Sequence, residues 1–385
     1  MNHKPHKLKG VGERYNYLRY LWELNHPKAI LKSPPPFVVI EPTTFCNLNC
    51  TYCARETMPR AKKHIDIDMF RAIVEKFRGL SKVLYLHHAG EPLLHPRIDE
   101  LVRIGKKAGY YTLMNTNATL LNEKKSEMII SSGLDVIEFS IDSIRKETYE
   151  SVRLNGKAPQ VWTNAIRFLE IKRDMQSPII VRIRMVKCED NENVLEKEMA
   201  LLNDLPFDEI RVSMYLNNKF WEDTETYFAG EPENPIFCTM PWKEITCTPD
   251  GVGACAVDFH TVYPWGDVSK ESVMDVWNSP ALIKLRKAFI SGNLEELKRV
   301  NDICWRCNAK TKRNYNDSPG FIKDVGNFGL RFPAYYFPYL RFVRTKQEES
   351  ALEEKYKNLD VAIQAFEEYA GYKIKIRKEQ YAEAM

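Results

Sequence analysis

Three cysteines stand close together near the amino terminus of this 385-residue chain, in the stretch FCNLNCTYCAR. Cys46 is followed by Cys50 after three residues, and Cys50 by Cys53 after two. Three thiolates fit a four-iron, four-sulfur (4Fe–4S) cluster in which one iron lacks a protein ligand and can take a small molecule. Zinc is the alternative, although a closed structural zinc site asks for a fourth nearby ligand.

A second group of cysteines lies farther along the chain: Cys238, Cys255, Cys304 and Cys307. A Pro-Asp-Gly turn at residues 249–251 predicts a β-hairpin that brings the first two of them together. Four thiolates can close a second iron–sulfur cluster completely, and a four-thiolate zinc site is again the alternative. Cys188 and Cys247 are interpreted as buried free thiols, with Cys247 also an alternative ligand.

Short β-rich runs alternate with amphipathic stretches from residue 37 onward. The expected strands are Phe37–Glu41, Val83–His88, Tyr110–Asn115, Val136–Ile141, Ile179–Val186 and Glu209–Tyr215. The expected helices between them are Asp66–Phe77, Arg97–Lys107, Glu123–Ser131, Trp162–Arg173 and Val194–Leu202. Further helices are expected at Tyr15–Leu24, Met274–Phe289 and Glu348–Tyr369. This rhythm predicts an α/β fold with a parallel sheet, which binds ligands at the carboxyl ends of its strands, where the first three cysteines lie.

The Cys-x3-Cys-x2-Cys spacing after the first strand, with Tyr52 before the last cysteine, resembles the radical S-adenosylmethionine (SAM) superfamily. Motifs at the following strand ends resemble its SAM-binding segments in order: Ala89, Gly90, Glu91 and Pro92 for the GGEP segment, Asn117 for an Asn-Gly pair, Ser140 and Asp142 for the SxD segment, and Arg153 for an arginine near the SAM carboxylate. This chain has Ala where the superfamily's segment begins with Gly. The resemblance implies a partial (β/α)6 TIM-like barrel, and a reduced cluster that cleaves SAM to a 5′-deoxyadenosyl radical.

The distal cysteines, with VMDVWNSP before the last pair, resemble a SPASM or twitch domain. No cysteine follows Cys307, so the resemblance implies the version with one auxiliary 4Fe–4S cluster, held by the four distal cysteines. The expected division is an N-terminal extension at 1–36, the barrel at 37–215, a linker at 216–236, a small auxiliary domain of hairpin and helix at 237–310, and a C-terminal extension at 311–385.

The resemblance further implies an oxidoreductase that acts on a small polar, sugar-like or aminocyclitol-like substrate and receives electrons from a flavodoxin or ferredoxin. His88 and Glu91 are the catalytic candidates, His88 as a proton acceptor because imidazole titrates near neutral pH. Arg182 and Arg184 alternate on one strand and therefore face the same side, either inward toward an anionic substrate or outward. A peptide- or protein-modifying maturase, an epimerase and a non-catalytic zinc-binding scaffold are the alternatives.

The amino-acid composition limits the kinds of binding partner and the cellular location that can be expected. The 56 basic and 52 acidic side chains leave a net charge of +4, too small to indicate nucleic acid or a membrane surface. The polar first 35 residues contain no signal-peptide core, and no run is long enough to span a membrane. Only 36 residues precede the first strand, short for the leader-binding module of a peptide maturase. We therefore expect a cytoplasmic protein, where cysteines serve as ligands or thiols rather than disulfides.

Overall fold

The computed structural model describes residues 11–188, 190–214, 236–253, 255, 258–261, 264–307, 311–312, 321–322, 332–333 and 346–374. The predicted linker lies outside these residues, except for residue 236. So does most of the stretch from residue 308 to residue 345 at the start of the predicted C-terminal extension.

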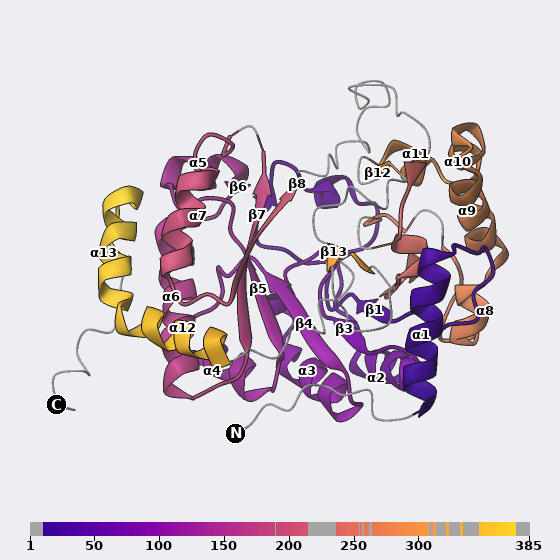
Figure 1. Cartoon of the computed structure of the whole chain (residues 1–385), viewed down its shortest axis with the longest axis horizontal. Coiled ribbons are helices and arrows are strands. Elements are labelled where there is room, and N and C mark those ends of the chain that lie inside the picture. The colour runs from indigo at the N-terminus through magenta and orange to yellow at the C-terminus, as the bar shows by residue number, and fades with distance from the viewer. Residues whose placement is uncertain are drawn as a thin grey trace.

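Six parallel strands form the body of one sheet (Figure 1). They are β1 (Phe37–Ile40), β3 (Val83–Tyr85), β4 (Tyr111–Thr116), β5 (Val136–Ser140), β7 (Ile180–Lys187) and β8 (Glu209–Met214), hydrogen-bonded in that order. All six were expected from the sequence, and their ends differ by at most one residue except at β3, which stops three residues earlier. The predicted α/β fold with a parallel sheet is thus confirmed.

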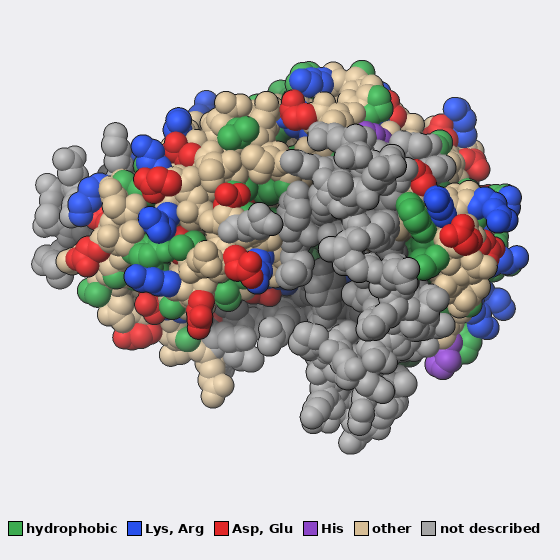
Figure 2. All heavy atoms as spheres, turned by 90° about the horizontal axis from the view of Figure 1, so that it is seen from above, with side chains coloured by type: hydrophobic (Ala, Val, Ile, Leu, Met, Phe, Trp, Pro, Cys, Tyr) green, Lys and Arg blue, Asp and Glu red, His purple; other side chains and the backbone are tan. Residues whose placement is uncertain are grey.

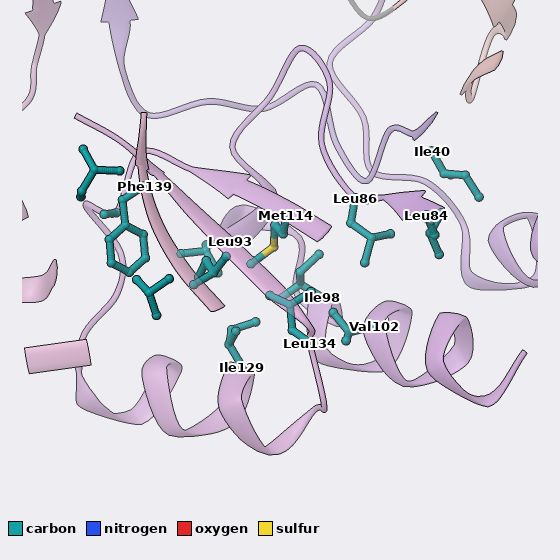
Figure 3. Packing of buried hydrophobic residues seen from close by; sticks show 14 of the residues in the cluster. Ile40, Leu84, Leu86, Leu93, Ile98, Val102, Met114, Ile129, Leu134 and Phe139 are labelled. Carbon is teal, nitrogen blue, oxygen red and sulfur yellow. The ribbon is translucent and has the colours of Figure 1, made fainter. Parts of the chain in front are cut away.

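Helices cover one face of this sheet. They are α2 (Ile67–Phe77), α3 (Ile98–Lys107), α4 (Glu123–Ser131), α5 (Lys146–Val152), α6 (Ala158–Asp174) and α7 (Leu195–Asp204). Side-chain caps fix where some begin: Asp66 accepts hydrogen bonds from the first turn of α2, and Asn122 does so for α4. Figure 3 shows the resulting core, in which Met114 of the sheet packs with Ile98 and Val102 of α3 and Ile129 of α4.

The opposite, inner face of the sheet changes character along the strands. At the amino ends a small apolar cluster fills it: Phe37, Val83, Tyr111, Leu113, Val136 and Ile180. Because side chains alternate between faces, Glu138 and Ser140 of β5 lie on this same side, as do Arg182 and Arg184 of β7. The inner face therefore becomes charged toward the carboxyl ends, and the inward alternative for Arg182 and Arg184 is the one observed.

The predicted hairpin is present, but its place differs from the expectation. Strands β10 (Glu244–Thr248) and β11 (Gly251–Gly253) pair around the 249–250 turn, and β10 also pairs in parallel with β1. The hairpin therefore extends the barrel sheet to eight strands instead of forming a separate small unit with the helix. The two paired segments are some 200 residues apart, so no local sequence pattern predicts that β10 pairs with β1.

Two predicted helices are each divided in two. The single helix expected at Met274–Phe289 is instead α8 (Val273–Trp277) and α9 (Pro280–Ser291), because Ser279 caps a new helix whose first residue is proline. The helix expected at Glu348–Tyr369 is α12 (Lys346–Lys357) followed by α13 (Leu359–Ala370). α13 packs on the barrel, with the Phe366 and Trp162 ring centroids 5.0 Å apart.

The other described elements are short, apart from the first helix. They are α1 (Val11–Asn25), β2 (Asn49–Cys50), η1 (Ala54–Thr57), η2 (Pro92–Leu94), β6 (Arg153–Leu154), β9 (Ile236–Phe237), η4 (Met240–Trp242), α10 (Leu294–Val300), α11 (Asp302–Arg306), β12 (Thr311–Lys312), β13 (Phe321–Ile322) and β14 (Phe332–Pro333). No helix in the described ranges is both long and apolar enough to cross a bilayer. Acidic and basic side chains are interspersed over the described part of the face in Figure 2, in keeping with the small net charge.

A buried arginine ties the N-terminal segment to the distal helices. Arg286 of α9 donates to the carbonyl of Pro241 at 2.8 Å and to that of Ala29 at 3.2 Å. Its guanidinium also stacks 4.4 Å from the centre of the Trp277 ring. Burial lowers the pKa of Arg286 to about 9, which leaves it charged at neutral pH. The segment before β1 and the distal unit are therefore one packed structure.

Candidate functional site

The three-cysteine loop leaves the carboxyl end of β1 and is fastened to the segment that follows α5. Strand β2 within the loop pairs with β6, so that Cys50 lies opposite Arg153. The loop then turns back on itself, with the Cys53 amide donating to the Cys50 carbonyl at 3.0 Å. This pairing places a guanidinium beside the middle cysteine and explains why Arg153 lies so far from it in sequence.

Nitrogen donors reach two of the three sulfurs. The Asn117 side-chain amide lies 4.0 Å from Cys46 Sγ, and the Arg153 guanidinium lies 3.9 Å from Cys50 Sγ. Burial raises the pKa of all three thiols, that of Cys50 to about 12, and neighbouring cysteines raise the pKa of Cys46 and Cys50 further. Metal ligation removes such protons outright, and hydrogen bonds to cluster sulfurs tune the bound cluster.

The donor set fits an iron–sulfur cluster. Three neighbouring thiols with nitrogen donors on their sulfurs are the environment that such clusters use. Over the described residues, no group of three or more His, Cys, Asp or Glu side chains is placed to hold a single metal ion. Each thiolate of a cluster binds a different iron, so cluster ligands need not converge on one point.

Asp142 organises the polar groups beside Cys50. Its Oδ2 accepts from the Tyr52 hydroxyl and from Arg153 Nε, both at 2.7 Å, and its Oδ1 accepts from the Val186 amide at 2.9 Å. Burial, together with the Asp142 carboxylate, raises the pKa of the Tyr52 hydroxyl. Ser140 ends β5 two residues earlier and is half-buried. The structure thus brings together three predicted residues, because Tyr52 and Arg153 both donate to Asp142.

The Ala89-Gly90-Glu91-Pro92 turn is pressed against the cysteine loop. A Cβ added to Gly90 would lie 2.2 Å from the Thr43 carbonyl oxygen and 2.6 Å from that of Phe45, so only glycine fits. The Glu91 amide donates to the same Phe45 carbonyl at 2.8 Å. The glycine of this motif is therefore required by the contact between two backbones.

The Glu91 carboxylate is engaged by the protein itself. It accepts hydrogen bonds from the Thr116 hydroxyl and the Asn117 backbone amide, both at 2.7 Å, and from the Leu93 backbone amide at 3.0 Å. Glu91 is 2% exposed, and burial raises its pKa against the effect of these hydrogen bonds. It links the turn to the end of β4 and so holds Asn117 beside Cys46, while Pro92 opens η2 directly after it.

His88 belongs to a buried network that the sequence did not reveal. Its Nδ1 lies 2.9 Å from Glu41 Oε1, and Arg60 grips the same carboxylate with two nitrogens at 2.7 and 2.8 Å. Burial alone would raise the pKa of Glu41, but hydrogen bonds from Arg60 and His88 outweigh it and lower the pKa to about 2. Because this carboxylate accepts, Nδ1 carries the proton, and Nε2 of His88 is buried without a partner among the described residues.

Arg60 also joins this network to the distal unit. Its Nε donates to the Phe259 carbonyl at 2.6 Å, and its Nη1 pairs with Asp250 of the hairpin turn at 3.1 Å. The Phe259 ring in turn meets the His88 ring edge to face at 5.1 Å. A charged residue ending the apolar strand Phe37–Ile40 was the available signal for Glu41; Arg60, in a polar loop, gave none.

The four distal cysteines are all half-buried. Cys238 and Cys307 lie close enough for their charges to interact, and burial together with Cys307 raises the pKa of Cys238 to about 12. Asn301 caps α11 by accepting from the Cys304 amide at 2.8 Å, which fixes the Cys-x2-Cys pair at the two ends of one helical turn. Cys255 lies two residues after the end of the hairpin. Of the remaining two, Cys247 is buried within β10 and Cys188 is half-buried after β7.

Comparison with known proteins agrees with this architecture. Residues 40–202 match the model of the Radical SAM superfamily, and residues 238–308 match that of SPASM, an iron-sulfur cluster-binding domain. The first match implies a 4Fe–4S cluster with SAM, and the second implies an auxiliary iron–sulfur cluster.

Curated relatives match over part of their length. GTP 3′,8-cyclase of Chlorobaculum tepidum is 32% identical over 126 residues, which are 32% of this chain and 38% of that protein. PqqA peptide cyclase of Gluconobacter oxydans is 32% identical over 124 residues, 32% of this chain and 34% of the relative. AdoMet-dependent heme synthase of Methanosarcina barkeri is 25% identical over 171 residues, 44% and 48% of the two chains. The chain thus spans about a third to a half of these relatives.

Solved structures share the fold. Streptococcus suis SuiB aligns with 71% of this chain and 72% of its own, at a TM-score of 0.54 and 15% identity. Native anSMEcpe with bound AdoMet aligns with 86% of this chain and 99% of its own, at a TM-score of 0.51 and 14% identity. With the cysteine loop, the strand-end motifs and the distal cysteines in place, the chain carries a domain of the Radical SAM superfamily followed by a SPASM-type iron–sulfur cluster-binding domain.

Proposed function

We propose that this radical SAM enzyme is an oxidoreductase that removes two hydrogen atoms from a small polar, sugar-like or aminocyclitol-like substrate. In this proposal Cys46, Cys50 and Cys53 hold the SAM-binding 4Fe–4S cluster, and Cys238, Cys255, Cys304 and Cys307 hold the auxiliary 4Fe–4S cluster. When bound, these groups and SAM supply the 5′-deoxyadenosyl radical and accept the remaining electron.

Some of the residues at the strand ends are proposed to contact SAM, and others are proposed to hold those residues in position. Tyr52, Ser140, Asn117, Arg153 and the backbone of Ala89 and Gly90 are the proposed SAM contacts. Asp142 and Glu91 act through them, because their carboxylates already accept hydrogen bonds from Arg153, Tyr52, Thr116 and the Asn117 amide. Glu91 is therefore a positioning residue in this proposal, and it no longer serves as a catalytic candidate.

The observation that supports an oxidation is the environment of the His88 ring. Oxidising a substrate radical releases a proton, which needs an acceptor. Glu41 accepts a hydrogen bond from His88 Nδ1, which turns the other ring nitrogen, Nε2, away from Glu41; Nε2 is buried without a partner among the described residues, and the ring lies beside Phe259 of the distal unit. A buried acceptor without a partner costs about 1–3 kcal/mol unless something pairs with it in the working enzyme. His88 Nε2 is the proposed proton acceptor.

Cysteine variants test the two clusters separately. Anaerobic reconstitution should give about eight irons per chain and 5′-deoxyadenosine when dithionite and SAM are added. Cys50→Ala should abolish 5′-deoxyadenosine formation, whereas Cys304→Ala should retain part of it and lose the oxidised product. Cys188→Ala is the matched control and should behave as the unmodified enzyme. Equal loss of both activities in Cys304→Ala would make the distal site structural, and stoichiometric zinc without 5′-deoxyadenosine would favour the scaffold alternative.

His88→Gln tests the base. A panel of hydroxylated acids and sugars, searched by mass spectrometry for loss of two hydrogens, identifies the product to follow. The variant should still form 5′-deoxyadenosine while product falls by about 10²-fold or more. Unchanged product formation in His88→Gln would remove His88 from the mechanism.

Peptide maturation is the second candidate. PqqA peptide cyclase is among the relatives, and SuiB has been solved bound to its precursor peptide SuiA. A peptide substrate would gain a crosslink or an oxidised side chain through the same radical, and an epimerase would return the hydrogen atom instead. In either case, we propose a flavodoxin or ferredoxin as the electron donor and cytoplasmic location.

A further inference from the structure

Two rows of side chains cross the inner face of the sheet near its carboxyl edge. Strand register places Asn115, Glu138, Arg182 and Glu209 in one row. The next row toward the carboxyl ends contains Ser140, Arg184 and Arg211. Parallel strands buried on both faces are normally apolar throughout, so these charges need an explanation other than packing.

The charges in these rows do not cancel. Glu209 pairs with Arg182 at 2.8 Å and with Arg211 at 2.8 Å, while Glu138 pairs with Arg184 at 3.3 Å and with Arg211 at 3.9 Å. Two carboxylates are thus shared among three guanidiniums. Among the described side chains of these two rows, guanidiniums therefore outnumber carboxylates by one.

The excess lies where a ligand can reach it. The Arg184 and Arg211 side chains are each 38% exposed, whereas Arg182 below them is 3% exposed. Arg184 can add two guanidinium nitrogens to an anion without giving up Glu138, because only its Nη1 is used in that pair.

Neighbouring polar atoms are also unoccupied. His87 Nδ1 and Asn115 Oδ1 are buried and have no hydrogen-bond partner among the described residues. The His87 ring lies on the same inner face, edge to face with Tyr85 at 5.4 Å. Burial, together with the Arg184 charge, lowers the pKa of His87 to about 3, so the ring stays neutral. Asn115 Oδ1 can only accept, so it suits a hydroxyl or amine of the molecule that the arginines bind.

We propose that Arg184 and Arg211 bind an anionic group of the substrate, a carboxylate or a phosphate ester, while Asn115 and His87 receive its neighbouring polar groups. This inference rests on the proposed function in one respect, that the bound molecule is the one oxidised. It narrows the substrate class to hydroxylated or aminated acids and their phosphate esters.

The test measures anion binding to the reconstituted holoenzyme already saturated with SAM. Inorganic phosphate and acetate are titrated separately by calorimetry at low salt. One or both should bind saturably, and Arg184→Gln and Arg211→Gln should each weaken binding about tenfold. Arg184→Lys should recover part of the affinity. Arg103→Gln, which removes an exposed arginine paired with Asp99 on α3, is the control and should bind as the unmodified enzyme does.

The outcomes separate cleanly. Stronger binding of phosphate points to a phosphate ester, and stronger binding of acetate points to a carboxylate. Absence of binding by either anion, or equal affinity in both glutamine variants and the control, overturns the inference. A tenfold loss of SAM affinity in Arg184→Gln with anion binding unchanged also overturns it, because the pair would then serve the cofactor. Formation of 5′-deoxyadenosine by the same preparations tests the proposed function independently.

Discussion

At the scale of residues, one carboxylate connects the barrel to the distal unit. Glu41 orients His88 and is gripped by Arg60, which also contacts Phe259 and Asp250. The arrangement keeps Glu41 ionised although it is fully buried, because the guanidinium and the imidazole N–H replace the water it has lost. A single buried charge thereby orients the His88 ring and holds the distal unit against the sheet.

The pKa of Glu41 makes a prediction about acid stability. Its folded-state pKa of about 2 lies below the usual 4.5, so its contribution is complete above pH 4.5 and is lost as pH falls toward 2. Glu41→Gln should be less stable at pH 6, and its free energy of unfolding should fall less steeply between pH 5 and 2, by up to roughly 3 kcal/mol. Urea unfolding at a series of pH values measures this.

The matched control for this carboxylate is Asp99→Asn. It removes a carboxylate from the surface pair with Arg103, and exposed pairs contribute little. Parallel curves for Glu41→Gln and the unmodified protein over this pH range would show that Glu41 is not the titrating group.

At the scale of elements, the turn after β3 supports the cysteine loop. Gly90 touches the loop backbone so closely that a methyl group has no space, and backbone atoms cannot move aside as a flexible side chain would. Gly90→Ala should therefore cost about 1–3 kcal/mol of stability and displace Cys46. Iron content after reconstitution should fall from about eight to about four per chain, with 5′-deoxyadenosine lost.

Ala89→Gly is the control for that turn, since it changes the neighbouring residue without adding an atom. It should retain its full iron content. If Gly90→Ala also kept both clusters, the close approach of the two backbones would not be what shapes the loop.

Much of this architecture could be predicted because it follows from sequence patterns between residues that are close along the chain. The strand–helix rhythm gave the barrel, and the cysteine spacing gave the loop at the carboxyl end of β1. Ser279 followed by Pro280 is a typical helix start, and this signal could have predicted the break at Asn278. The apolar spacing nevertheless predicts one helix, because it continues on both sides of the break. Two features had no local signal: the pairing of β10 with β1, and the partners of Glu41, which are 19 and 47 residues away.

At the scale of the whole molecule, the segment before β1 is part of the distal core. Arg286 donates to carbonyls of Ala29 and Pro241 and stacks on Trp277, while the Trp242 indole donates to the Lys28 carbonyl at 2.8 Å. Arg286→Ala would leave these buried carbonyls without donors. It should destabilise the protein by about 3 kcal/mol and open residues 26–36 to limited proteolysis.

Arg103→Ala serves as the control for that variant, because it removes an arginine from the surface of α3. Its stability and its cleavage pattern should match those of the unmodified protein. Cleavage within residues 26–36 at the same rate in all three proteins would mean that Arg286 does not hold this segment in place.

The pairing of β10 with β1 has a consequence for electron flow. One strand leads into the amino-terminal cysteines and the other belongs to the hairpin that precedes Cys255, and both lie in the same hydrogen-bonded sheet. Neighbouring strands are held about 4.8 Å apart, so this pairing fixes the position of the hairpin relative to β1 within the described part of the chain. Tunnelling between redox centres depends steeply on their separation. In the proposed function, the separation of the two clusters is therefore fixed to the extent that these two strands fix it, and it is set when the sheet forms.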